Sequence, residues 1–147
     1  MATRFLKNTD YAGYIKPEIF LQITGAALTA DPSDSLLRAE STAIATIKNF
    51  LSGRYDCGKI FTIPTGDDTR DLWIVKCVMV LALFDIYHQT GVKDVPEHRR
   101  VAYDDTIQWL KDAGRGDIET NLPPLPDDVN PGDVRFNSRP TRSDYRY

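Results

Sequence analysis

The residues best suited to hold a metal ion are two cysteines and two histidines, and their spacing does not fit a zinc site. They are Cys57, Cys77, His88 and His98, and at least nine residues separate each from the next. Structural zinc sites take paired ligands at short spacing, such as Cys-x2-Cys. Cys77 also lies in an apolar run, which is typical of a small buried side chain. We therefore expect no metal and no other cofactor.

Three pairs of adjacent aspartates could in principle supply acid–base catalysis. They are Asp67-Asp68, Asp104-Asp105 and Asp127-Asp128. Neighbouring side chains on one helix point about 100° apart and cannot flank one scissile bond. Helix caps and solvated faces explain these pairs better. The sequence has no Gly-x-Ser-x-Gly elbow and no Gly-rich loop before a helix, so we expect that the protein is not an enzyme.

Composition predicts one domain with a real core. The chain has 147 residues, 41% of them hydrophobic, and its 18 basic and 21 acidic side chains give a net charge of -3. This balance disfavours a nucleic-acid binder that works by neutralising phosphates, although DNA could still pass nearby.

The sequence also bears on the compartment. The N-terminus has no apolar stretch before a cleavage site, so we expect no signal peptide. The longest apolar run, 72–84, contains Lys76 and is too short to span a bilayer, so we expect a core helix and no membrane partner. Two cysteines are no disulfide framework, which fits a reducing cytosol.

Hydrophobic periodicity predicts an all-α body, a small bundle of about four helices near 17–24, 34–53, 69–89 and 97–113. Residues 31–34 should cap the second helix, and Asp67, Asp68 or Thr69 the third. Gly114 and Gly116 should end the last. The expected core comprises Leu37, Ile44, Ile47, Leu51, Met79, Leu83, Ile107 and Leu110. The helix at 69–89 is apolar on almost every side, so part of its surface is expected to meet another chain.

Residues 54–68 form an irregular loop between helices. Ile60, Phe61 and Ile63 make a short β-prone patch, either a hairpin arm or a loop with its apolar side chains tucked in. We take these three as candidate interface residues.

Residues 121–147 are predicted to form an extended C-terminal arm, separate from the helical domain at 1–120. Dense prolines exclude a helix there, and arginine then alternates with aromatic residues. The candidate interface residues of the arm are Arg135, Phe136, Arg139, Arg142, Tyr145 and Tyr147. Three interpretations remain open: an arm that orders on a neighbour, a disordered end, or a nucleic-acid contact. Four aspartates offset the four arginines and weaken the last.

Three phrases resemble a family of tailed-phage head–tail connector proteins of the adaptor or head-completion type. Phe20-Leu21-Gln22-Ile23-Thr24 resembles the end of the family's first helix. The phrase from Asn49 to Tyr55, ending in Gly-Arg-Tyr, matches the close of its next helix. The phrase from Tyr103 to Gly116, with its Trp-Leu pair and terminal glycine, matches its last helix. The resemblance covers roughly residues 11–120. This chain departs from the family in three respects: its third helix is more hydrophobic, its loop at 54–68 is longer, and its C-terminal arm has no counterpart in the short members.

The resemblance implies a structural virion protein in the neck between head and tail, assembled in the host cytoplasm. Such subunits form a ring, usually twelve-fold, beneath the portal protein, and a tail or second neck-ring protein binds below. Genomic DNA passes through the ring without specific binding, which agrees with the net acidity. The alternative is a helical interaction module of a cellular complex with no viral role. A ring subunit predicts large discrete oligomers, and a cellular adaptor predicts one stable partner.

Overall fold

The computed structural model describes residues 4–89 and 95–126, and its elements are all helices. They are α1 (Asn8–Ala12), α2 (Pro17–Thr24), α3 (Asp34–Leu51), α4 (Cys57–Ile60), α5 (Leu72–Gln89) and α6 (Glu97–Arg115). In this part of the chain the single β contact is an isolated bridge between Tyr55 and Pro124. The predicted all-α class is confirmed.

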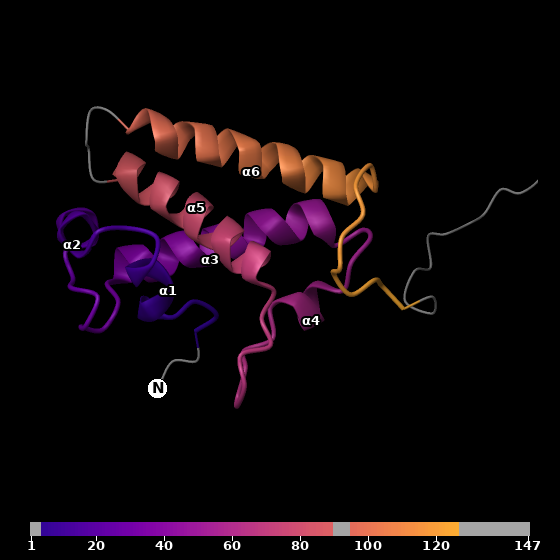
Figure 1. The fold of residues 1–147 in the computed structure, drawn as a ribbon, viewed down its shortest axis with the longest axis horizontal. Coiled ribbons are helices and arrows are strands. Elements are labelled where there is room, and N and C mark those ends of the chain that lie inside the picture. The colour runs from indigo at the N-terminus through magenta and orange to yellow at the C-terminus, as the bar shows by residue number, and fades with distance from the viewer. Residues whose placement is uncertain (1–3, 90–94, 127–147) are drawn as a thin grey trace, which may run out of the picture.

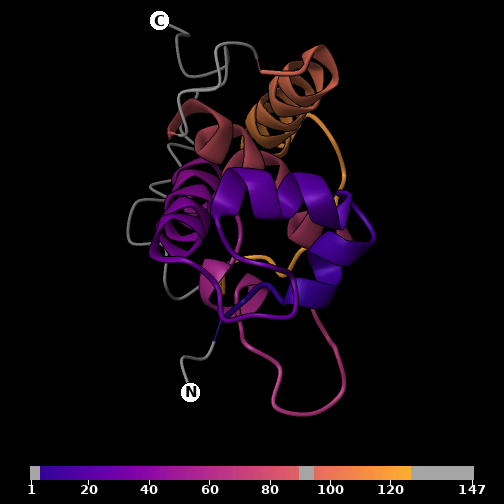
Figure 2. The same ribbon diagram turned by 90° about the vertical axis from the view of Figure 1, so that its left-hand side faces the viewer.

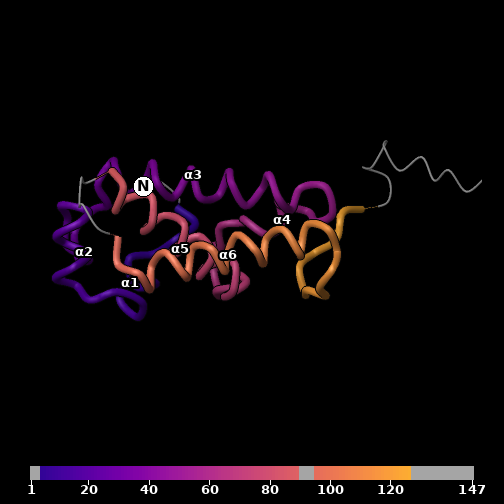
Figure 3. The backbone as a smooth tube through the Cα atoms, turned by 90° about the horizontal axis from the view of Figure 1, so that it is seen from above, coloured from indigo at the N-terminus to yellow at the C-terminus, as the bar shows by residue number. Residues whose placement is uncertain are grey.

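Helix α5 is the centre of the bundle. It lies between α3 and α6, and α2 also contacts it (Figures 1 and 3). Side chains all round α5 are buried, including Ile74, Val78 and Leu83, each 0% exposed. A helix apolar on every side is stable in water only where other elements surround it, and here α3 and α6 do most of this.

Helix α5 is buried by its own chain more completely than the sequence suggested. By length and composition α5 could cross a membrane, but 61% of it is buried inside the chain, as in a core helix. Large apolar side chains are exposed on α5 only in its first turn, where Leu72 is 77% and Trp73 43% exposed. The surface that α5 leaves for another chain is therefore confined to that end.

The N-terminal segment is the part of the body that the sequence did not predict. Phe5, Leu6, Tyr11 and Ile15 all belong to the core, and Tyr11 lies on α1. Figure 2 shows α1 and α2 together at one end of the bundle. Five residues of α1 are too few to display a helical period, which is why the pattern gave no signal.

The four predicted helices are confirmed, with small changes at their ends. α2 begins at Pro17 and is followed by Gly25 in the left-handed conformation. Ser33 caps α3 by accepting a hydrogen bond from the Leu36 amide. α5 begins at Leu72 rather than near 69, because the Asp71 carboxylate accepts from the Ile74 amide at 3.0 Å and is its cap.

The irregular loop holds a short helix in place of a hairpin. Residues 57–60 form α4, capped by the Asp56 carboxylate, which accepts from the Lys59 amide. No strand forms within residues 54–68, so the hairpin alternative is wrong. The second alternative, a loop with apolar residues tucked in, describes Ile60 well because it is 5% exposed.

Five of the eight predicted core residues are fully or nearly fully buried. They are Ile47, Leu51, Met79, Leu83 and Leu110. Ile44 and Ile107 are half-buried and pack against the core from outside. Leu37 is half-buried too, and it lines a surface groove. These three residues lie at the edge of the apolar face of their helices, where hydrophobic periodicity does not distinguish a fully buried side chain from a half-buried one.

Two glycines near the end of α6 have different roles. Gly116 has a φ of 80° and is the left-handed C-cap, as predicted. Gly114 lies inside the helix, so its predicted role as a stop is wrong. A Cβ atom at Gly114 would overlap the main-chain carbonyl oxygen of Phe50 on α3. Gly114 thus permits close contact between the backbones of α3 and α6.

Replacing Gly114 with alanine is expected to destabilise the protein by about 1–3 kcal/mol, because α3 and α6 must separate to admit the methyl group. Where no clash occurs, replacing glycine with alanine in a helix interior stabilises the protein by about 1 kcal/mol. The control is Gly53→Ala, since nothing lies within 4 Å of a Cβ there. Chemical denaturation measures both variants. Equal or greater stability of Gly114→Ala would contradict the close contact.

Candidate functional site

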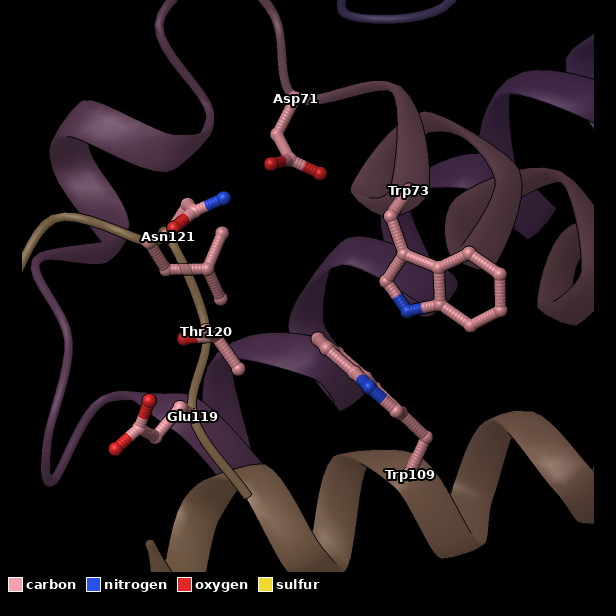
Figure 4. A pocket seen from close by; sticks show the side chains of 7 residues that line it. Asp71, Trp73, Trp109, Glu119, Thr120 and Asn121 are labelled. Atoms are coloured by element: carbon pink, nitrogen blue, oxygen red, sulfur yellow. The ribbon is translucent and has the colours of Figure 1, made fainter.

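The most distinctive surface feature is a cleft that contains both tryptophans of the chain. It has a volume of about 470 Å3, and its lining is Asp71, Trp73, Trp109, Glu119, Thr120, Asn121 and Leu122. We call it the tryptophan cleft. Trp73 comes from the first turn of α5, Trp109 from α6, and the segment after α6 forms the facing wall (Figure 4). Three separate parts of the sequence build it.

The two indoles form an aromatic pair on one wall of the tryptophan cleft. Their ring centroids lie 5.7 Å apart at an interplanar angle of 67°, an edge-to-face contact. The Lys76 Nζ sits 5.1 Å from the centre of the Trp73 ring, so this face already attracts a cation. Trp73 is 43% exposed, which leaves part of the indole surface in solvent.

The polar side of the tryptophan cleft is acidic. The Asp71 carboxylate points into the space beside Trp73, and Glu119 lies at the rim on the facing segment (Figure 4). Within residues 4–89 and 95–126 neither carboxylate pairs with an arginine or lysine. Aromatic faces beside uncompensated carboxylates favour an arginine-bearing ligand.

The facing wall is hydrogen-bonded to residues 54–56, between α3 and α4. The Asp56 amide donates to the Pro123 carbonyl at 2.9 Å, and the Leu125 amide donates to the Arg54 carbonyl at 3.2 Å. Leu122 is 6% exposed and belongs to the core. The first residues of the predicted arm, 121–126, therefore lie against the helical body.

A second groove lies between α3 and the loop at 61–63. Its volume is about 410 Å3, and its lining includes Phe61 and Ile63 together with Leu37 and Ile44. Two of the three candidate interface residues in the loop are thus at the surface. Ile60 is in the core of its own chain, so we correct its assignment as an interface residue.

The arm's candidate residues lie outside the described residues. They are Arg135, Phe136, Arg139, Arg142, Tyr145 and Tyr147. Their roles stay predictions. The tryptophan cleft was not predicted, because Trp73 and Trp109 lie in helices where an apolar residue reads as part of the core, and Asp71 and Glu119 belong to no motif. No local pattern joins these positions; only the fold brings them together.

The groups considered for metal binding are not gathered in the part of the chain that the structure describes. No cluster of three or more His, Cys, Asp or Glu side chains occurs there. Cys77 is buried in α5, and burial raises the pKa of its thiol to about 12. Burial also raises the pKa of Cys57. Thiols that stay protonated at neutral pH are poor nucleophiles and poor ligands.

We expect that EDTA leaves the thermal unfolding midpoint unchanged, because the four cysteine and histidine side chains are dispersed. The single variants Cys57→Ser and His98→Gln should have the same metal content as the parent protein, measured by elemental analysis of purified protein. A fall in the midpoint with EDTA, together with one equivalent of bound zinc, would contradict the expectation.

The two sequence motifs in which the resemblance to connector proteins was noted meet at one end of the bundle. The first, 49–55, ends α3, and the second, 103–116, ends α6. The Arg54 guanidinium donates to the Arg115 carbonyl at 3.1 Å, and Gly114 lies against Phe50. The two motifs thus pack on each other, and Arg54 and Tyr55 of the Gly-Arg-Tyr motif both make contacts with later parts of the chain.

No family model, curated protein or solved structure matches this chain.

Proposed function

We propose that this protein is a structural subunit of a tailed-phage neck, a ring-forming adaptor that joins the portal to the tail. The observation that carries the proposal is the packing of the two resembling phrases on each other at the end of α3 and α6. Motifs that specify one helix–helix junction must be spatial partners, because the close backbone contact between α3 and α6 and the capping of α6 both depend on them.

Charge and surface chemistry support the same proposal. A channel that lets DNA slide should not grip phosphates, and the net charge of the chain is -3. Two clefts among the described residues are lined in part by aromatic and apolar side chains, which suits contacts between proteins. The expected partners are further copies of this chain, the portal protein and a tail or second neck-ring protein.

The genes around this one give the first test. Genes for portal, capsid and tail proteins are expected beside it, since phage neck proteins are encoded with them. The direct test is deletion of the gene in the phage. We expect DNA-filled heads and finished tails that do not join, seen by electron microscopy, and rescue by the gene supplied in trans.

Purified protein distinguishes the proposal from a cellular adaptor. A neck subunit should form discrete rings, alone or on the portal, in native mass spectrometry and electron microscopy. Joined, infectious particles from the deletion phage would refute the proposal. So would one stable cellular partner in equal amount with no ring in either setting.

A further inference from the structure

We propose that the tryptophan cleft of one subunit binds the C-terminal segment 135–147 of a neighbouring copy. This rests on the proposed function in one respect, namely that copies of the chain lie side by side. The cleft offers two indoles and two unpaired carboxylates, and the segment offers four arginines, one aspartate and three aromatic rings. The chemistry of site and segment is complementary in both charge and aromatic character.

Arginine fits the tryptophan cleft better than any other side chain. Its planar guanidinium stacks on an indole face and donates hydrogen bonds to a carboxylate at the same time. Asp71 stands beside Trp73, so both contacts are within one side chain's reach (Figure 4). Lys76 already lies over one face of the Trp73 ring, so an incoming guanidinium would stack on the indole surface that Lys76 leaves open. An adjacent Phe136 or Tyr145 would add an aromatic contact with the indole pair.

The reach of the chain favours a neighbouring copy over the same subunit. The described chain runs to Pro126, where residues 122–125 are fixed against Tyr55 and Asp56. Eight residues lie between Pro126 and Arg135, so an extended chain covers nine steps from one to the other, about 28 Å at roughly 3.1 Å per step. Helix α6, with 19 residues, is about equally long, 28 Å at 1.5 Å per residue. An extended chain of this length reaches about one helix length beyond Pro126, far enough to bring Arg135 to a neighbouring copy.

The two tryptophans make the contact directly measurable. They are the only two in the chain, and both line the cleft, so intrinsic tryptophan fluorescence reports on this site alone. Binding of segment 135–147 should shift the emission to the blue and reduce quenching by acrylamide, because the exposed part of Trp73 becomes covered.

Two full-length variants separate the halves of the contact. The arm variant carries Arg139→Glu and Arg142→Glu. The cleft variant carries Asp71→Asn and Glu119→Lys; asparagine is chosen at 71 because it keeps the cap that α5 needs. The control variant, Asp104→Lys with Asp105→Lys, changes two exposed carboxylates on α6 outside the cleft. Circular dichroism checks that all three fold.

The decisive measurement uses a synthetic peptide of residues 135–147 added to each variant. We expect it to protect the tryptophans of the arm variant and the control variant. The peptide should bind the cleft variant at least about tenfold more weakly than it binds the arm variant, because charge-assisted contacts are lost. Equal protection of all variants, or none in any, would overturn the proposal.

Mixing the two variants tests whether the contact runs between copies. The arm variant keeps a working cleft and the cleft variant a working arm, so the pair should form a dimer that neither forms alone, seen by light scattering. Protection in the parent protein that does not depend on concentration, with no dimer in the mixture, would place the segment on its own subunit and overturn the proposal. Rings that persist in the arm variant would also overturn it while leaving the proposed function intact. Absence of rings in the parent protein, both alone and on the portal, counts against the proposed function and not against this contact.

Discussion

Truncating Leu83 to alanine should lower the free energy of unfolding by about 2–5 kcal/mol. Leu83 is 0% exposed and lies in the middle of α5, the helix that α3 and α6 enclose. Removing its branched end leaves a cavity that two rigid neighbouring helices cannot easily fill. The loss therefore combines the transfer free energy of the removed atoms with the cost of the void.

The matched control is Leu72→Ala on the same helix. Leu72 is 77% exposed, so its truncation should change stability by less than about 0.5 kcal/mol. Urea unfolding followed by circular dichroism measures both. A loss below about 1 kcal/mol for Leu83→Ala, or equal losses at the two positions, would mean that the core does not centre on α5.

Replacing Arg70 with methionine is the second large effect that we expect, a loss of about 3 kcal/mol. The Arg70 side chain is 1% exposed and pairs with Asp10 and Asp68, each at 2.7 Å. It also donates to the Phe5 carbonyl at 2.7 Å. Without the guanidinium, two carboxylates and a carbonyl each lose their charged hydrogen-bond donor, and among the described residues only backbone amides and the more distant Lys7 still contact the carboxylates. We place the loss at the low end for buried pairs because Asp68 is 39% exposed.

The control for Arg70 is an exposed pair of the same chemistry. Arg100 pairs with Glu97 at 2.7 Å, but both side chains are largely in solvent. Arg100→Met should leave the unfolding midpoint unchanged within error, since surface ion pairs contribute little. Similar losses at Arg70 and Arg100 would show that the Arg70 network is not a buried anchor for the N-terminal segment.

The Arg70 network also predicts an acid sensitivity. Hydrogen bonds from Arg70 hold the pKa of Asp68 well below its usual value near 4. A carboxyl whose folded-state pKa is depressed stabilises the fold above the unfolded pKa and loses that contribution as pH falls below it. Unfolding midpoints should therefore drop more steeply below about pH 4 in the parent protein than in Arg70→Met. Parallel pH profiles of the two proteins would contradict this.

The N-terminal segment shows where sequence reasoning stopped. Arg70 and the Arg4–Glu40–Tyr11 network attach it to the body; the Tyr11 hydroxyl donates to Glu40 at 2.7 Å. Burial raises the pKa of Tyr11 well above its usual value, as expected for a phenol that stays protonated beside a carboxylate. Ion pairs between positions so far apart in the chain carry no periodic signal, so the sequence left this segment irregular.

The sequence by itself determined the class of fold and the positions of the four principal helices. Hydrophobic period, Pro17 at a helix start, Ser33 as a cap and Gly116 as a stop are local signals, and each acts within a few residues. Only the tertiary structure decided which apolar residues are buried. Leu37 and Leu83 are both leucines on apolar helix faces, but Leu37 lies at the surface and Leu83 in the core because their neighbours differ. The tryptophan cleft was decided there too, since its aromatic and acidic residues come from α5, α6 and the segment after α6, and packing alone brings them together.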